Sequence, residues 1–190
     1  MNTGSLDVSV IDVARATAVA TISLGARPEG AAVDGSGRVY VNLEDKAQIA
    51  VIDSSTRRVV ATHGLPGCIE PTGLAFDPIA RLLIAACHNR VAKLIDAASG
   101  EDRGTVGIGK DADGAIFDAG RRLVYVPSAD GVLTIFRLSA GGQPTMIASL
   151  ATAPGARTAA LDERSGRIYL AANSGATATR EAFQLVVVAP

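Results

Sequence analysis

Short apolar runs of four to six residues alternate with turn-forming residues along the whole chain. Val, Ile, Leu and Tyr dominate the runs, while Gly, Asp, Ser and Pro separate them, which is typical of β-strands joined by tight turns. No stretch of helical length has an apolar period of 3.6 residues. The pattern therefore predicts an all-β protein with no helix longer than two turns between residues 28 and 172.

The runs recur with a period in the low forties. Four similar runs end at Asp12, Asp53, Asp96 and Arg137, in steps of 41, 43 and 41 residues. Aspartates that close a second kind of run follow the same period, at positions 34, 77, 118 and 162. Each unit holds four such runs, and a repeat of this length with four strands indicates a β-propeller blade.

The amino-acid pattern of the repeat resembles that of a known family. The segment 27–53, with parallels at 122–126 and 167–173, resembles the YVTN-type β-propeller repeat. Segments 68–73 and 83–89 are similar to the YncE-like bacterial members of that family. The resemblance implies antiparallel four-stranded blades and a periplasmic or secreted location. The first residues of the given chain lack the basic and apolar regions of a signal peptide, so they do not indicate a cellular location.

The family's blade also implies a phase for the strands, because the run after the Arg-Pro-Glu-Gly loop is the innermost strand. On this phase residues 1–190 form a single propeller domain of about four blades and 17 strands. Its parts are a partial blade at 8–24, three blades at about 28–66, 67–110 and 111–152, and a last blade at 153–190.

Members of the family have about seven blades, so the chain resembles the C-terminal part of a longer propeller. We expect an open arc or partial propeller; the alternatives are a closed four-bladed ring and a dimer that completes a ring. An open arc leaves unpaired strand edges and an apolar blade face in water, which predicts self-association.

Composition narrows the set of partners. With 48% hydrophobic and 19% charged residues, the 190-residue chain suits a packed globular domain. The formal net charge of −1 gives no electrostatic footprint for nucleic acid. No apolar run approaches the roughly 18 residues that would span a bilayer. Neither nucleic-acid binding nor membrane insertion is therefore expected.

Antiparallel blades place their loops on two faces. We expect the hairpin aspartates, such as Asp77 and Asp118, to serve turns by accepting backbone N–H groups. The opposite face has more varied loops on a rigid frame, and we place a ligand site there. These loops contribute Arg27, Glu29, Asn42, Glu44, Asp45, Lys46, Glu70, His88, Asn89, Arg90, Lys110, Asp111, Asp113, Asp130, Arg157 and Asn173. The ligand-binding candidates among them are Arg27, Glu29, Glu70, His88, Asn89, Asp111, Asp113 and Arg157. The polar insertion at residues 175–180 is interpreted as a flexible loop.

The two cysteines allow three interpretations. Cys68 precedes an inner strand and Cys87 ends the strand that pairs with it, where Thr72 is expected opposite Cys87. They are unremarkable structural cysteines, a disulfide, which needs Cα atoms within about 7 Å, or part of a metal site. A zinc site needs four ligands in recognisable spacing, which this chain lacks, so no metal is expected. His63, near the end of a fourth strand, is interpreted as a surface residue.

No catalytic motif stands out. The sequence has no Gly-x-Ser-x-Gly, His-Glu-x-x-His or Walker loop, so no catalytic residue and no cofactor is assigned. The first hypothesis is a non-catalytic binding or scaffold module that recognises a protein, peptide, glycan or small ligand. The alternative is a lactonase-like hydrolase or a quinoprotein-like enzyme. Its acid–base groups would come from Glu29, Glu70, His88, Asp111 and Asp113.

Overall fold

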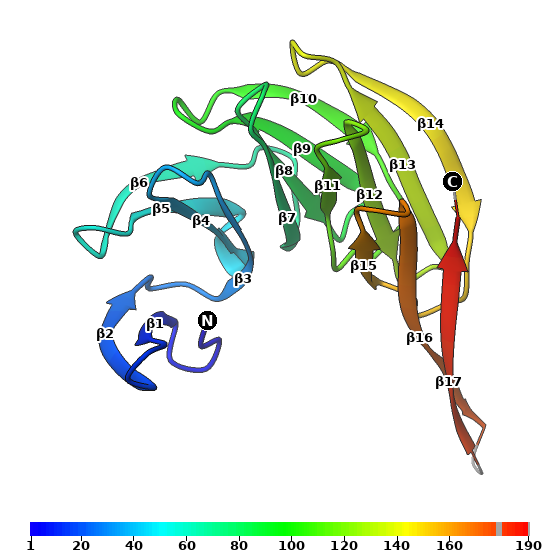
Figure 1. Ribbon diagram of the computed structural model, residues 1–190, viewed down its shortest axis with the longest axis horizontal. Helices are drawn as coiled ribbons and strands as arrows, with labels where there is room; N and C mark the ends of the chain where they lie inside the picture. The colour runs from blue at the N-terminus through cyan, green and yellow to red at the C-terminus, as the bar shows by residue number, and fades with distance from the viewer. Residues whose placement is uncertain (178–179, 190) are drawn as a thin grey trace.

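Antiparallel β-sheets follow one another along an open arc in the computed structural model, which describes residues 1–177 and 180–189 (Figure 1). The chain begins with a two-stranded sheet, β1 (Asp7–Asp12) and β2 (Thr17–Ser23). Three four-stranded sheets and a three-stranded sheet follow. Their strands are β3 (Pro28–Val33), β4 (Arg38–Leu43), β5 (Gln48–Asp53) and β6 (Arg58–Gly64); β7 (Pro71–Asp77), β8 (Leu82–Cys87), β9 (Val91–Asp96) and β10 (Asp102–Gly107); β11 (Ile116–Asp118), β12 (Leu123–Ser128), β13 (Val132–Leu138) and β14 (Pro144–Ala151); and β15 (Thr158–Asp162), β16 (Arg167–Thr177) and β17 (Arg180–Val188).

Each sheet is one blade, in which strands consecutive in the chain pair antiparallel. The first strands of the blades lie side by side, because β3 contacts β7, β7 contacts β11, and β11 contacts β15. In the described residues the only helix is one 3₁₀ turn, Glu44–Lys46, and no helix there could cross a membrane. The predicted all-β fold of about four blades in an open arc is therefore confirmed.

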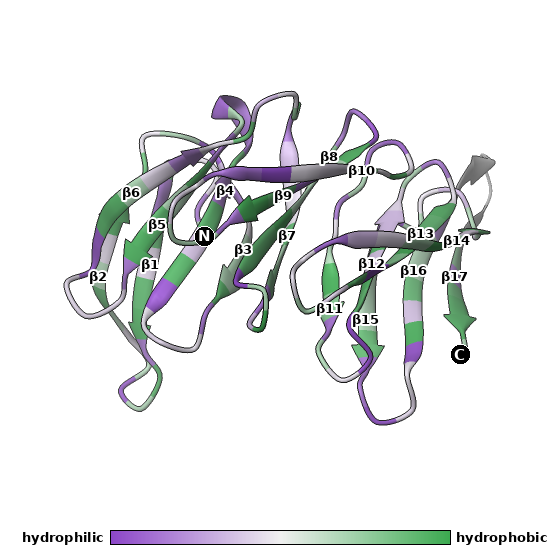
Figure 2. Ribbon diagram, turned by 90° about the horizontal axis from the view of Figure 1, so that it is seen from above, coloured by the Kyte–Doolittle hydropathy of each residue, from purple (hydrophilic) through white to green (hydrophobic). Residues whose placement is uncertain are grey.

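The hydrophobic core lies between the blades, with one layer at each interface. Alternate side chains of a central strand point to opposite neighbouring sheets, so each such strand serves two layers. Tyr40 and Ile49 pack with Leu83 between the first two full blades. The next layer includes Ile84, Leu94, Val124 and Phe136, and the one after it includes Tyr125, Leu133, Ile168 and Leu170. Figure 2 shows hydrophobic residues on strands along the whole arc.

The inner strands approach one another closely at glycines. A Cβ at Gly30 would lie 2.1 Å from the carbonyl oxygen of Thr72, and a Cβ at Gly73 would lie 2.4 Å from the carbonyl carbon of Gly114. Only a residue without a side chain allows this packing of backbone on backbone. The repeat therefore needs residues without side chains, as well as apolar residues, where one blade meets the next.

The hairpin aspartates serve turns, as predicted. Asp77 Oδ1 accepts the backbone N–H of Ile79 at 2.9 Å, and Asp118 Oδ1 accepts that of Arg121 at 2.9 Å. Asp77 has a second role that the sequence did not reveal. It is fully buried, and Arg122 of the next blade contacts both of its carboxylate oxygens, at 3.2 and 2.5 Å. This paired charge ties two blades together.

The sequence interpretations of two buried polar residues were wrong. His63 is buried, because its ring lies against Gly100 and its Nε2 is 3.1 Å from the carbonyl oxygen of Ala97 in the next blade. Asn42 lies in β4 and not in a loop. It is fully buried, and its amide donates to the carbonyls of Thr72 and Gly73 at 3.2 and 3.0 Å. Both residues were misassigned because their contacts come from the adjacent blade.

A disulfide joins the two cysteines, with Cα atoms of Cys68 and Cys87 5.6 Å apart. Cys87 lies opposite Pro71, and not opposite Thr72, because the pairing shifts between Pro71 and Gly73. Cys87 therefore lies opposite a residue that is three positions from Cys68 in the chain, and not four. The expected loop at residues 175–180 is largely strand, since β16 ends at Thr177 and β17 begins at Arg180; residues 178–179 lie outside the described residues.

We expect Gly73→Ala to destabilise the protein by about 1–3 kcal/mol, the usual cost of overpacking. The added methyl would meet the backbone of the neighbouring blade, which cannot move like a side chain. Gly107→Ala is the control, because a Cβ at Gly107 would meet no atom within 4 Å. Urea unfolding monitored by circular dichroism measures both. Equal stability of the two variants would contradict the backbone packing.

We expect loss of the disulfide to cost about 3 kcal/mol, the loop-closure value for a cross-link over about 20 residues. The double variant Cys68→Ala/Cys87→Ala should unfold at lower urea concentration than the oxidised protein. Reductant should lower the stability of the parent chain and leave the double variant unchanged. A parent chain whose unfolding ignores reductant would show that the bond contributes nothing.

Candidate functional site on the loop face

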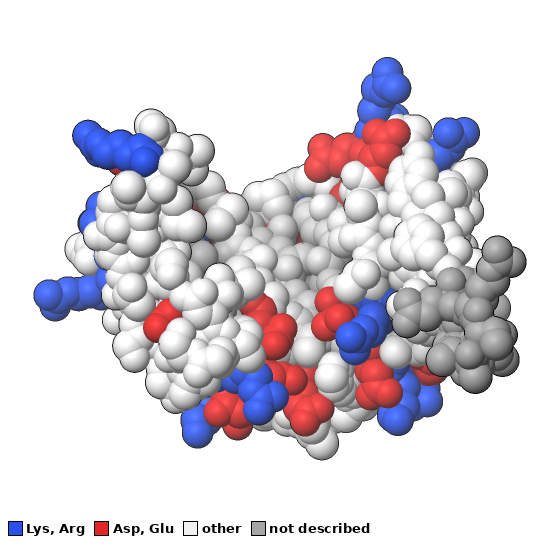
Figure 3. Space-filling model, turned by 90° about the horizontal axis from the view of Figure 1, so that it is seen from below, with Lys and Arg blue, Asp and Glu red and all other residues white. Residues whose placement is uncertain are grey.

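One face of the arc is formed by the loops that join blades and those that join second to third strands. We call it the loop face; it comprises residues 24–27, 44–47, 65–70, 88–90, 108–115, 129–131 and 152–157. Figure 3 shows a hollow with few charged side chains, bordered along its lower rim by acidic and basic groups. Polar groups at the edge of a hollow on a rigid frame are the usual setting of a binding site.

Hydrogen bonds between neighbouring loops fix the loop face. The backbone N–H of Arg27 donates to Asp45 Oδ1 at 2.8 Å, and its guanidinium donates to Glu44 Oε2 at 2.7 Å. Two blades further on, the backbone N–H of Lys110 donates to Asp130 Oδ2 at 2.8 Å. In both places a loop between blades is held by an acid of the loop between second and third strands. Arg27 therefore positions loops.

The second full blade has a His–Glu pair on this face. His88 Nδ1 lies 2.8 Å from Glu70 Oε2, and His88 Nε2 is buried with no hydrogen-bond partner among the described residues. The next residue, Asn89, is structural. Its side chain accepts the N–H of Ile69 and donates to the carbonyl of Gly67, each at 2.9 Å. The loop before β7 thus holds His88 at a fixed place beside a carboxylate.

Glu29 is the carboxylate of this face whose pKa is raised. Partial burial is the main cause, and the negative charges of Glu44 and Asp113 add to it. Arg27 and His88 act in the opposite direction but do not cancel the effect. These influences also show that Glu44, Asp113 and His88, which come from three blades, each lie near Glu29.

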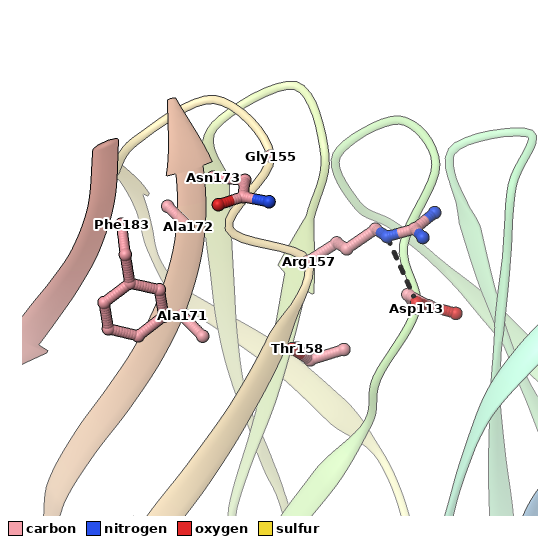
Figure 4. Close-up of a pocket in the computed structure, with 8 residues that line it drawn as sticks. All are labelled: Asp113, Gly155, Arg157, Thr158, Ala171, Ala172, Asn173 and Phe183. Atoms are coloured by element: carbon pink, nitrogen blue, oxygen red, sulfur yellow. Dashed lines mark ion pairs between the residues drawn. The ribbon is translucent and has the colours of Figure 1, made fainter. Parts of the chain in front are cut away.

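A pocket of about 370 Å³ lies where the last blade meets the loop face (Figure 4). At one side Arg157 Nε lies 3.2 Å from Asp113 Oδ2, and Figure 4 shows the rest of the guanidinium beyond this ion pair. Phe183 stands at the opposite side. The lining residues are Asp113, Gly155, Arg157, Thr158, Ala171, Ala172, Asn173 and Phe183. The pocket combines an aromatic side, a small apolar floor and a few polar groups.

The eight candidate residues have different surroundings. Asp113 and Arg157 line the pocket together, and Glu70 pairs with His88. Asp111 has a left-handed backbone with φ 54°, and its N–H donates to the carbonyl of His88 at 3.1 Å, so it shapes a loop. Arg27 and Asn89 also hold loops, whereas Glu29 is set apart by its pKa.

Sequence reasoning missed Thr158 and Phe183 as lining residues. Thr158 stands four residues before Asp162, where earlier blades have a glycine four residues before their aspartate. This departure from the repeat was the available signal. Phe183 is the one aromatic residue of β17, and nothing in the local pattern separated it from a core position. Among the described residues, no three His, Cys, Asp or Glu side chains gather as a metal site.

The fold and its loop face define part of a β-propeller. No protein-family model matches the chain, and no curated protein matches it. Among solved structures, 1140 chains match. One, from the Kuenenia stuttgartiensis Hydrazine Synthase, matches with a TM-score of 0.78 at 12% sequence identity. The match covers 99% of this chain and 58% of that chain, so this chain spans little more than half of its neighbour's length. Such low identity shows a shared propeller-like fold and nothing about activity.

We expect Glu29→Gln to stabilise the protein at neutral pH. Because the folded-state pKa lies above the ordinary value of 4.5, the folded state favours protonated Glu29, and stability is lost as pH rises through the raised pKa. The variant cannot ionise, so its advantage should vanish below pH 4.5. Thermal melting across this pH range measures it. The exposed hairpin variant Glu163→Gln should show no such pH-dependent gain; a similar gain there would contradict the role of burial.

Proposed function

We propose that this chain is part of a β-propeller that binds a ligand on its loop face without chemical change. The observation that carries the proposal is the pocket between Asp113, Arg157 and Phe183. Its volume of about 370 Å³ lies within the range of small-molecule sites, roughly 300–1,000 Å³. It suits a small polar ligand, a sugar ring, or one side chain of a peptide or protein.

The chemistry of the pocket supports recognition of a polar group beside an apolar one. Arg157 is about half exposed even though it pairs with Asp113, so its guanidinium keeps donors for a ligand. Asn173 offers an amide with both donor and acceptor groups. The ring of Phe183, 69% exposed, offers a stacking surface. A ligand that covers the ring and bonds to Arg157 would use both.

We further infer that the chain is a YVTN-type, YncE-like bacterial propeller protein with an extracytoplasmic location. The amino-acid pattern of the repeat supports the family. The Cys68–Cys87 disulfide supports the location, because disulfides persist in oxidising compartments.

A thermal-shift panel of monosaccharides, amino acids, dipeptides and dicarboxylates, together with a glycan array, tests the binding proposal. At least one compound should raise the melting temperature, and Arg157→Ala or Asn173→Ala should weaken its binding at least about tenfold, equal to about 1.4 kcal/mol. Arg164→Ala is the matched control, because Arg164 lies in the turn of the same blade on the opposite face. Binding that survives both pocket variants, or a panel without any binder, would contradict the proposal.

The His88–Glu70 pair favours a second candidate function, a lactonase-like hydrolase. A carboxylate 2.8 Å from Nδ1 is the geometry that orients an imidazole as a general base. Hydrolysis of five-membered lactones should then be measurable, and should fall at least about a hundredfold in His88→Ala, the usual share of a general base. His63→Ala is the control, since His63 is buried between blades. Lack of hydrolysis by the parent chain would exclude this candidate.

A further inference from the structure

A cleft opens between the first two full blades, near the hairpins of the face opposite the loop face. Its volume of about 360 Å³ lies within the range of small-molecule sites, roughly 300–1,000 Å³. We call it the interblade cleft. One blade contributes Tyr40, Val60 and Ala61 to its lining, and the next blade contributes Arg81, Ala97 and Ala98. The interblade cleft shares no lining residue with the pocket on the loop face.

Arg81 brings a guanidinium without a partner to the interblade cleft. The corresponding residue of the next blade is Arg122, which has the same left-handed backbone, with φ 56° against 54° for Arg81. Arg122 forms an ion pair with Asp77, and its Nε donates to the carbonyl of Leu138 at 2.9 Å. Arg81 is exposed, and among the described residues its side chain has neither an ion pair nor a hydrogen bond. Its N–H donors are therefore available to a ligand.

A histidine accounts for this difference between the two blades. The carbonyl of Ala97 corresponds to that of Leu138, because the N–H of each residue donates to the carbonyl of the corresponding arginine at 3.0 Å. In the third full blade that carbonyl accepts a bond from the side chain of Arg122. In the second, the carbonyl oxygen of Ala97 lies 3.1 Å from Nε2 of His63. His63 thus takes the place of the guanidinium, and Arg81 is left in the cleft.

Tyr40 adds a buried hydroxyl to the interblade cleft. The residue is only 2% exposed, and its ring stacks on Phe76 with the ring centroids 6.0 Å apart. Its hydroxyl has no hydrogen-bond partner among the described residues, although Tyr40 lines the cleft. Burial raises the pKa of Tyr40, while the charges of Arg81 and Arg38 act to lower it, so both guanidiniums lie near the hydroxyl. The hydroxyl stays protonated and can donate beside Arg81.

The charges around the interblade cleft favour a ligand with one negative charge. Arg38 forms an ion pair with Asp53, so its charge is balanced within the protein. Asp34 accepts the N–H groups of Ser36 and Arg38 at 2.8 and 3.0 Å. Both carboxylates line a hollow that adjoins the cleft at Arg38 and Arg81. They would repel the second charge of a phosphate ester, and a carboxylate avoids this repulsion.

We propose that the interblade cleft binds a carboxylate that carries a short apolar group, as a free acid or at the C-terminus of a peptide. The N–H fork of Arg81 matches the two oxygens of a carboxylate, and the hydroxyl of Tyr40 donates to one of them. The valine and alanine residues of the lining cover the apolar group. This site is independent of the pocket beside Arg157, so either proposal can fail without the other.

Titration with isovalerate, followed by calorimetry and by amide NMR spectra, tests the proposal. Binding should saturate, and the amide signals of Ala61 and Ala98 should shift. Isovaleramide has nearly the same shape without the charge, and it should bind at least about tenfold more weakly, because hydrogen bonds to charged groups are the stronger ones. Acetyl-glycyl-valine distinguishes the two sources of the carboxylate. A site for peptide ends should bind it more tightly than isovalerate, and a site for free acids less tightly.

Two variants remove the recognising groups one at a time. Arg81→Gln and Tyr40→Phe should each weaken the binding of isovalerate at least about tenfold. Arg57→Gln is the matched control for the first, because Arg57 is an exposed arginine in the turn after β5 with φ 55°. Tyr125→Phe is the control for the second, since Tyr125 is the buried tyrosine at the equivalent register position of the third full blade. Thermal melting checks that each variant is folded.

Four results would overturn the proposal. Failure of the unmodified chain to bind either isovalerate or acetyl-glycyl-valine would exclude a carboxylate site. Equal affinity for isovalerate and isovaleramide would show that the charge is not recognised. Binding that the controls weaken as much as Arg81→Gln and Tyr40→Phe would place the contact outside the cleft. Binding lost in Arg157→Ala and kept in both cleft variants would assign the ligand to the pocket on the loop face.

Discussion

Close packing of one blade against the next is the interaction on which this structure depends. A single four-stranded blade is too small to bury both of its faces, so its apolar residues are covered only by its neighbours. The contact has two components along each interface. Central strands pack side chains between blades, such as Leu83 in one layer and Phe136 in the next, while inner strands meet backbone to backbone at Gly30 and Gly73. Both components recur because the repeat recurs.

The same constraint explains the buried polar groups. Asn42, His63 and Asp77 are all covered by the following blade, and each has a partner there. Burying a polar group without a partner is costly, so these contacts also fix how the blades meet. Asn42 is satisfied only at its Nδ2, since its buried Oδ1 has no partner among the described residues. Specific polar contacts thus fix the relative position of neighbouring blades, which apolar contacts alone do not determine.

The loop face depends on this frame. The acids of the loops between second and third strands hold the loops between blades, as Asp45 does for Arg27 and Asp130 for Lys110. With the loops held, His88 and Asp113 of the next two blades lie close enough to Glu29 to influence its pKa. The pocket beside Arg157 lies next to these loops, on the blade formed by β15–β17.

The sequence by itself determined the blades. Strand alternation, turn aspartates and the period near 42 are local or periodic signals, and they sufficed to predict the all-β class and the blades. The strand phase and the open arc were expected from the resemblance of the repeat to a known family. What only the tertiary structure decided lies between blades. The burial of Asn42 and His63 and the contact of Asp77 with Arg122 depend on residues of the next blade, 30 to 45 positions away in the chain. The pattern of one strand does not encode how two blades are oriented, so it cannot predict these contacts. The regular strand pairing expected from the sequence likewise missed the shift between Pro71 and Gly73.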